Sequence, residues 1–271
     1  MNGNDGIAGK TVIVIGATSV VGEYLLSMLK RRGAMTIAVS RHATERSEGP
    51  LRWVNSGSHD WLNKISNADF LVNLAPLPLL PDILPLIVRI GVQRIVGIGT
   101  TSIYSKKNSP YKQDQEIVQS QAAAERSLQE TCGNLELDWT VLRPTLVYDG
   151  KTDKNIMRIK KFISRFHFVP LASPANGKRQ PLHAKDMAKA CLSVLETETT
   201  KNKSYNIGGG EILTYHKMVK RIFISLGKPA VIVPIPQIIL RAMVLMLSKF
   251  RQFQDLTPGV IERMNQDMIY K

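Results

Sequence analysis

The stretch that most constrains the fold is Lys10–Gly22, with the sequence KTVIVIGATSVVG. Thr11–Ile15 is a short, β-branched run typical of a buried strand. Gly16 ends this run, and the segment 23–29 (EYLLSML) has the composition of a helix. A strand, a tight glycine turn and a helix in this order open a dinucleotide-binding fold, in which the helix N-terminus faces a pyrophosphate.

The residues of this turn have distinct predicted roles. Gly16 allows the chain to turn sharply, and Gly22 allows the helix to pack close to the strand. Ser19 stands midway between them, and both its amide and its hydroxyl are predicted donors to a phosphate. Thr18 and Val20 complete the candidate cofactor-binding residues of the turn. The alternative is an ordinary strand–helix corner, because two glycines alone are a weak signal.

Strand-like and helix-like segments alternate through the first half of the chain. The predicted strands are 35–40, 51–54, 70–75, 93–99 and 137–142. Such alternation predicts an α/β fold with a parallel, doubly wound sheet. Two distant cysteines, Cys132 and Cys191, argue against a zinc site and a disulfide framework. No run of about 18 apolar residues suggests a membrane span, so we expect a cytoplasmic protein.

Positive charge is concentrated in one segment. The chain has a net charge of +14, and residues 151–180 hold eight Lys and Arg against one Asp. Helical spacing over 153–166 places Arg158 and Lys161 on a basic side, opposite an apolar side. With Arg179, they are candidate contacts to a small anionic substrate; the alternative is a solvated basic surface. Nucleic acid is not expected, because aromatic residues do not interleave with the charges.

The C-terminal region has two further predicted helices. The segment 231–250 is apolar and too short to span a bilayer. We expect it to form a helix packed on its own domain, with an interfacial membrane helix as the alternative. The segment 258–270 is predicted to be the final short helix.

Several motifs resemble a known family. Gly16-x-x-Ser19-x-x-Gly22, the segment 142–150 (LRPTLVYDG) and the segment 179–186 (RQPLHAKD) are similar to motifs of extended short-chain dehydrogenase/reductases. The resemblance is to atypical members of the NAD-dependent epimerase/dehydratase group, and it extends from about Thr11 to Tyr270. It implies a Rossmann core over 1–150 with a returning segment 179–207, and a smaller substrate lobe over 151–178 and 208–271. A homodimer is a further expectation.

The resemblance also assigns cofactor residues. Arg41 follows the second strand, where an arginine pairs with a 2′-phosphate, so NADP is predicted to be preferred over NAD. The alternative is a solvated loop arginine. Ala75 is the small residue after the fourth predicted strand, where the cofactor passes. Pro144 matches the proline that flanks the nicotinamide, and Gln121 is a candidate hydrogen-bond partner of the ribose.

The catalytic residues depart from the family pattern. Thr100 lies at the position of the catalytic serine. Alignment on the segment 122–125 (AAAE) puts Ile117 and Gln121 at the positions of the Tyr-x-x-x-Lys pair. Because isoleucine cannot transfer a proton, we take Tyr104 as the catalytic phenol, with Tyr111 as the other nearby candidate.

Two functions follow from the resemblance and the missing pair. One is hydride transfer on a nucleotide-linked sugar or a similar anionic substrate. The alternative is a catalytically degenerate, NADP(H)-binding sensor, scaffold or assembly protein. His183 is predicted to cap or brace a helix rather than to catalyse.

Overall fold

The computed structural model describes residues 6–57, 60–247 and 258–270. Its main sheet has the order β12-β7-β6-β5-β1-β2-β4-β3. The parallel strands are β1 (Thr11–Ile15), β2 (Met35–Ser40), β4 (Leu51–Asn55), β5 (Phe70–Asn73), β6 (Arg94–Ile98), β7 (Asp138–Pro144) and β12 (Lys203–Ile207). β3 (Arg46–Glu48) is an antiparallel edge strand. The predicted doubly wound α/β fold is therefore confirmed.

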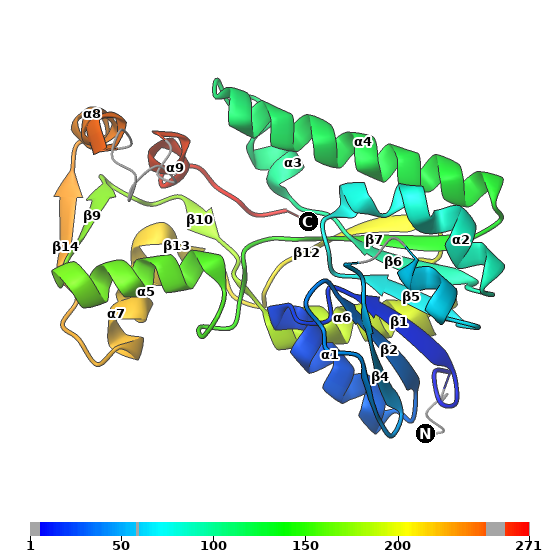
Figure 1. The fold of residues 1–271 in the computed structure, drawn as a ribbon. Coiled ribbons are helices and arrows are strands. Elements are labelled where there is room, and N and C mark those ends of the chain that lie inside the picture. Colours follow the sequence, from blue (N-terminus) through cyan, green and yellow to red (C-terminus); the bar gives the residue numbers. More distant parts are fainter. Residues whose placement is uncertain (1–5, 58–59, 248–257, 271) are drawn as a thin grey trace.

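Helices cover both faces of this sheet (Figure 1). α1 (Val20–Arg31) and α6 (Ala184–Glu196) pack together on one face. α2 (Leu84–Arg89) and α4 (Lys112–Asn134) cover the other face, and the short α3 (Ser102–Ser105) follows β6. The central strands have their alternating side chains in one or the other of these two apolar layers. Burial on both faces explains why β1 reads as a continuous apolar run.

A smaller lobe lies beside the carboxyl ends of the strands (Figure 1). Its elements are α5 (Lys154–Phe166), β9 (Val169–Ala172), β10 (Lys178–Arg179), β13 (Leu213–Thr214), α7 (Tyr215–Ser225), β14 (Ile232–Ile235), α8 (Gln237–Leu247) and α9 (Pro258–Arg263). They share a third apolar cluster that includes Ile163, Leu171 and Phe223. β8 (Val147–Tyr148) pairs with β11 (Leu182–His183) where the chain passes between core and lobe. The predicted residue boundaries of the two parts stay a prediction.

Two predictions for the C-terminal region are wrong in part. The segment 231–250 begins with strand β14, which pairs with β9, and only then forms α8; residues 248–250 lie outside the described residues. The final helix ends at Arg263 rather than at Tyr270. Residues 264–266 continue in turns and a bend, and Met268 then forms a bridge with Arg179 of β10. No helix among the described residues is long and apolar enough to cross a membrane.

Candidate dinucleotide site and adjoining pocket

Close backbone contacts require both glycines of the β1–α1 turn. Gly16 has a φ of 74°, and its amide and that of Ala17 donate to the Val39 carbonyl at 3.0 and 3.2 Å. A Cβ built on Gly16 would lie 2.9 Å from the amide nitrogen of Ala75. A Cβ on Gly22 would lie 2.2 Å from the Ala17 carbonyl oxygen. The start of α1 therefore lies against the Ala17 backbone of the turn, and Gly16 lies against the loop that follows β5.

Ser19 caps α1. Its Oγ accepts a hydrogen bond from the Gly22 amide at 3.2 Å, which occupies the oxygen but leaves the hydroxyl proton for another acceptor. The amides of Val20 and Val21, at the first two helical positions, have no acceptor within the helix. The turn thus fits a dinucleotide pyrophosphate, since it combines free first-turn amides with the positive helix end.

The end of β2 lies next to this turn. The hydroxyls of Thr18 and Ser40 are 3.2 Å apart and connect the turn to β2. Arg41 follows immediately, with an exposed side chain. This position, beside the expected adenosine ribose, is compatible with a contact to a 2′-phosphate. The preference for NADP stays a prediction.

A buried amide holds the backbone after β5. Asn73 is 2% exposed; its side-chain nitrogen donates to the Ala75 carbonyl at 3.2 Å, and its oxygen accepts from the Ala75 amide at 3.3 Å. Asn73 thereby shapes the loop that passes Gly16. The sequence analysis missed this residue, although a polar side chain at the end of an apolar strand was a usable signal.

The loop after β6 is tied to the end of β7. The amide and the hydroxyl of Thr101 both donate to the Pro144 carbonyl, at 3.2 and 3.1 Å. The Thr100 hydroxyl donates to the Ser102 hydroxyl at 3.0 Å and accepts from the Ser102 amide at 3.1 Å. Thr100 lines the adjoining pocket. The structure therefore brings Thr100 and Pro144 together at the carboxyl edge of the sheet, where ligands of such folds bind.

Tyr104 lies in a different environment from Thr100. Arg143 Nη1 donates to the Tyr104 hydroxyl oxygen at 3.0 Å, and the Tyr104 and Tyr270 ring centroids are 5.3 Å apart. Arg143 also donates from Nε to both oxygens of buried Glu125, and this hydrogen-bonded pairing raises the pKa of Arg143. The described residues that line the pocket include Thr100 but not Tyr104. Sequence reasoning gave no role to the Glu125–Arg143 pair.

Ile117 and Gln121 are one turn apart on α4. Ile117 is 40% exposed, and Gln121 is partly buried. Neither side chain is an acid or a base in the physiological range. At these two positions α4 therefore offers no residue pair for proton transfer.

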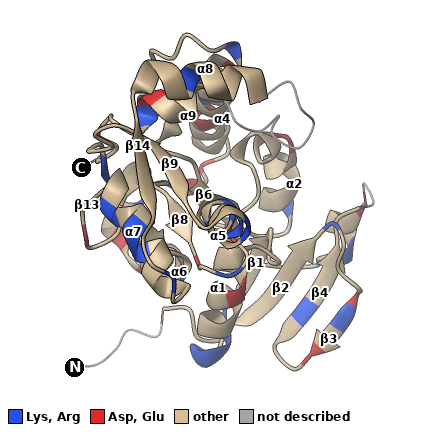
Figure 2. Cartoon of the chain, turned by 90° about the vertical axis from the view of Figure 1, so that its left-hand side faces the viewer, with Lys and Arg blue, Asp and Glu red and all other residues tan. Residues whose placement is uncertain are grey.

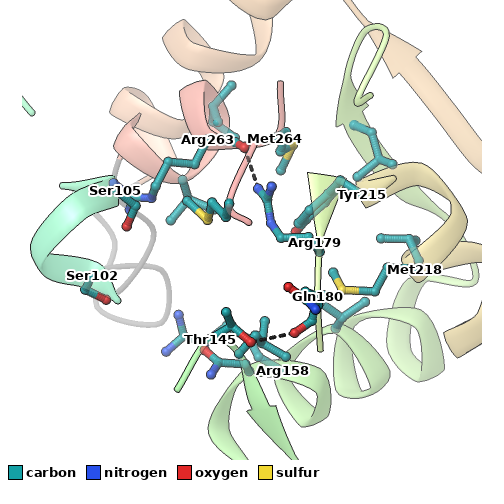
Figure 3. Close-up of a pocket in the computed structure, with 18 of the residues that line it drawn as sticks. Ser102, Ser105, Thr145, Arg158, Arg179, Gln180, Tyr215, Met218, Arg263 and Met264 are labelled. Atoms are coloured by element: carbon teal, nitrogen blue, oxygen red, sulfur yellow. Dashed lines mark hydrogen bonds between the residues drawn. The ribbon is translucent and has the colours of Figure 1, made fainter. Parts of the chain in front are cut away.

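The pocket lies between the β6 loop and the lobe and has a volume of about 530 Å³ (Figure 3). Arg158 of α5 and Arg179 of β10 both line it, whereas Lys161 is exposed and is not among its described lining residues. Four cationic side chains among its described lining residues, counting Lys106 and Arg263 of α9, suit an anionic ligand. The predicted set is thus split, with Arg158 and Arg179 at the pocket and Lys161 outside it.

Arg179 is held by carbonyl groups. It is 5% exposed, and its guanidinium donates to the carbonyls of Lys178 at 2.9 Å, Gln266 at 2.7 Å and Arg263. Its Cζ lies 5.1 Å from the centre of the Tyr215 ring. Burial lowers the pKa of Arg179. Because these partners are neutral, the guanidinium leaves positive potential in the pocket wall.

The C-terminal tail forms part of the same wall. The Met268 amide donates to the Lys178 carbonyl at 2.8 Å, and the Lys178 amide donates to Asp267 Oδ1 at 2.8 Å. Tyr270 lines the pocket, and burial raises its pKa. No local pattern predicted this position, since it depends on pairing with β10, about 90 residues earlier in the chain.

An ionic cluster joins the core to the lobe. Asp114, in the first turn of α4, accepts from Ser109 Oγ at 2.8 Å and pairs with Lys106 Nζ and Arg263 Nη1, both at 2.7 Å. Burial by itself raises the pKa of Asp114, but these hydrogen bonds outweigh burial and leave the pKa lowered. The cluster connects α9 to the start of α4.

His183 has the structural role predicted for it. Its Nδ1 accepts from the Lys185 amide at 3.1 Å and caps α6. Its ring lies against those of Tyr24 and Tyr148, with centroids 5.6 and 5.3 Å away.

Comparison with known proteins agrees with this geometry. The sequence model of the NAD dependent epimerase/dehydratase family matches residues 79–208. The chain is 27% identical over 237 residues to NADH dehydrogenase [ubiquinone] 1 alpha subcomplex subunit 9, mitochondrial, of Dictyostelium discoideum. That alignment covers 79% of this chain and 63% of the relative, so the chain spans less than two thirds of the relative's length.

Two epimerases are also similar. UDP-glucose 4-epimerase of Vibrio cholerae is 20% identical, over 84% of this chain and 79% of that protein. The structure of UDP-glucuronic acid 4-epimerase from Bacillus cereus in complex with NAD superposes with a TM-score of 0.70 at 15% identity, covering 83% and 87% of the two chains. The match of the NAD dependent epimerase/dehydratase family model to residues 79–208, together with the sheet order and the glycine turn, bears out the resemblance to extended short-chain dehydrogenase/reductases of that group.

Proposed function

We propose that the chain binds NADP(H) at the β1–α1 turn and works as a cofactor-binding subunit or scaffold without turnover. The observation that carries this proposal is the pair Ile117 and Gln121 at the expected proton-transfer positions. An isoleucine has no exchangeable proton, and a glutamine amide is neither acid nor base in the physiological range. The Tyr104 hydroxyl, which the sequence suggested as a substitute, accepts from Arg143, and Tyr104 is not among the described lining residues of the pocket.

The likeness to a subunit of NADH dehydrogenase supports the same proposal. A subunit can retain a dinucleotide for stability or sensing, since a ligand that binds only the folded state stabilises that state. In this chain, the first-turn amides of α1 would hold the pyrophosphate, and Arg41 would pair with the 2′-phosphate. When bound, the dinucleotide would supply hydride-transfer chemistry, but the α4 residues would supply no proton.

Restoring the missing pair tests the proposal. We expect wild type to bind NADPH but to show no NADPH oxidation and no epimerisation over a panel of UDP-sugars. The double variant Ile117→Tyr with Gln121→Lys should gain measurable turnover. The control is Gln115→Tyr with Gln119→Lys, which has the same spacing on exposed positions of α4. Turnover by wild type would overturn the proposal, and equal gains in both double variants would refute the assignment of the two positions.

Cofactor choice has its own test. A charge-assisted hydrogen bond to the 2′-phosphate contributes roughly 1.5–3 kcal/mol, which is about a tenfold to hundredfold preference for NADPH over NADH. Calorimetry should show this preference for wild type and its loss for Arg41→Ala. The matched control is Arg31→Ala, an exposed arginine at the end of α1. Equal or tighter binding of NADH by wild type would contradict the prediction.

A second candidate function is slow reduction or epimerisation of a nucleotide-linked sugar. The observation in its favour is that Thr100, Arg158 and Arg179 line one pocket. Arg158→Glu should weaken UDP-glucose binding at least tenfold in calorimetry, whereas Lys161→Glu, on the same helix, should have little effect. Equal losses in both variants would mean that the charges act only as a solvated surface. The homodimer and the cytoplasmic location stay predictions.

A further inference from the structure

Helix α8 exposes apolar side chains along most of its length. Of its 11 residues, QIILRAMVLML, the buried ones are Leu240 and Val244. Ile238 is 84% exposed and Met246 is 70% exposed. The other exposed apolar side chains of the helix are Ile239, Ala242, Met243 and Leu245. A single exposed apolar side chain is ordinary, but a contiguous set of them is typical of a contact surface.

The exposed apolar surface continues onto the strand that precedes α8. β14 forms a two-stranded sheet with β9. Val233 in this strand and Val231, the residue just before it, are both exposed. Phe168 is also exposed and lies close to Val231, since the amide of the next residue, Val169, donates to the Val231 carbonyl at 3.0 Å. We call the exposed apolar side chains of α8, together with Val231, Val233 and Phe168, the apolar face.

The lobe that carries the apolar face is strongly basic. The segments 151–178 and 208–271 hold sixteen Lys and Arg but only five Asp and Glu, so they account for +11 of the net charge of +14. Figure 2 shows Lys and Arg on α5, α7 and α8, around β14, on the side of the lobe that faces the viewer. Arg165 of α5 and Lys217 and Lys220 of α7 are exposed. The lobe that carries the apolar face therefore also presents basic residues on α5, α7 and α8.

We propose that the apolar face docks on an anionic lipid surface, with α8 lying in the plane of the interface. A helix with a broad apolar side inserts that side below the lipid headgroups, and basic residues nearby contact anionic headgroups. An apolar groove of a protein partner would also accommodate the isoleucine and methionine side chains. It would not by itself account for the excess of Lys and Arg on this lobe, whereas an anionic bilayer is complementary to both features.

Vesicle flotation of the whole chain tests the proposal. We expect wild type to float with phosphatidylcholine vesicles that contain 30% phosphatidylglycerol and not with pure phosphatidylcholine vesicles. Ile238→Ser with Met246→Ser should weaken binding at least tenfold. Arg165→Glu with Lys220→Glu should weaken it by about tenfold or more, because each basic residue near an anionic surface adds to the attraction. The control is Leu79→Ser with Leu86→Ser, which removes two exposed apolar side chains from the larger domain that contains the main sheet.

Several results would overturn the proposal. One is absence of wild-type binding to the anionic vesicles, and another is binding that the α8 variant retains in full. Binding lost equally in the Leu79/Leu86 control would also overturn it. Self-association of wild type without vesicle binding, abolished by the α8 variant, would assign the face to a second copy of the chain. Circular dichroism and NADPH binding show whether the α8 variant folds. If it does not fold, two other measurements test the proposal. Vesicle binding should be weaker in the Arg165/Lys220 variant and weaker for wild type at 0.5 M than at 0.1 M NaCl, and binding unchanged in both would overturn the proposal.

Discussion

Gly22→Ala is the sharpest test of the turn between β1 and α1. The added Cβ would lie 2.2 Å from the Ala17 carbonyl oxygen, 2.6 Å from the carbonyl carbon and 3.0 Å from Cα. All three are backbone atoms of the turn itself, so no side-chain rotation relieves the contact. The start of α1 must move away from the Ala17 backbone by roughly 1 Å to restore ordinary van der Waals contact.

Both stability and cofactor binding should respond to this shift. Overpacking of this kind costs about 1–3 kcal/mol, and the value here should be near the upper limit, because the obstacle is backbone. A loss of about 3 kcal/mol corresponds to a fall in Tm of roughly 6–12 °C for a domain of this size. Since the displaced helix start carries the amides that face the pyrophosphate, dinucleotide affinity should fall at least tenfold.

Thermal melts by circular dichroism and fluorescence titration with NADPH measure the two effects. The control is Gly133→Ala in α4, where an added Cβ meets nothing within 4 Å. That variant should be as stable as wild type or more so, because alanine favours the helix by up to about 1 kcal/mol. A Gly22→Ala protein that melts within 2 °C of wild type and binds NADPH equally well would refute the role assigned to Gly22.

Three further substitutions or probes are informative. Asp114→Asn should lower the free energy of unfolding by about 3 kcal/mol in urea titrations, because it leaves two partly buried cations without their carboxylate. The pKa of Asp114 is below its ordinary value of 3.8, so the stabilisation by its carboxylate is complete above about pH 4 and is lost as the pH falls through the folded pKa. The Asp114→Asn variant should therefore lose less stability than wild type on acidification. Burial raises the pKa of Cys132 and Cys191 to about 12, so Ellman's reagent at pH 8 should modify neither in the native protein and both after unfolding; rapid native labelling would contradict the burial. Tyr270→Ala should destabilise the protein by about 1 kcal/mol through loss of the contact with Tyr104, and unchanged stability would show that this ring contact does not stabilise the fold.

Local sequence determined the elements and the glycine turn. Thr11–Ile15, Gly16 and Gly22 were interpretable because a strand, a turn and a helix depend on neighbouring residues and their spacing. The same reasoning identified His183 as a helix cap, since the capped amide is only two residues away. The predicted helix 258–270 was too long, because residues after Arg263 form turns and then, at Met268, a bridge to β10 that is about 90 residues away in the sequence.

Tertiary structure alone decided which side chains meet in the pocket and beside it. Tyr104 contacts Tyr270, 166 residues later, and Arg143 pairs with Glu125 across α4 and β7. Arg179 was predicted as a contact to an anionic substrate, but its partners in the structure are carbonyls from the C-terminal region and the Tyr215 ring. Periodicity reports only which side of an element is apolar. The partners of a polar side chain depend on how distant elements pack, because hydrogen bonds and ion pairs require a few ångströms of separation in space rather than any fixed spacing along the chain.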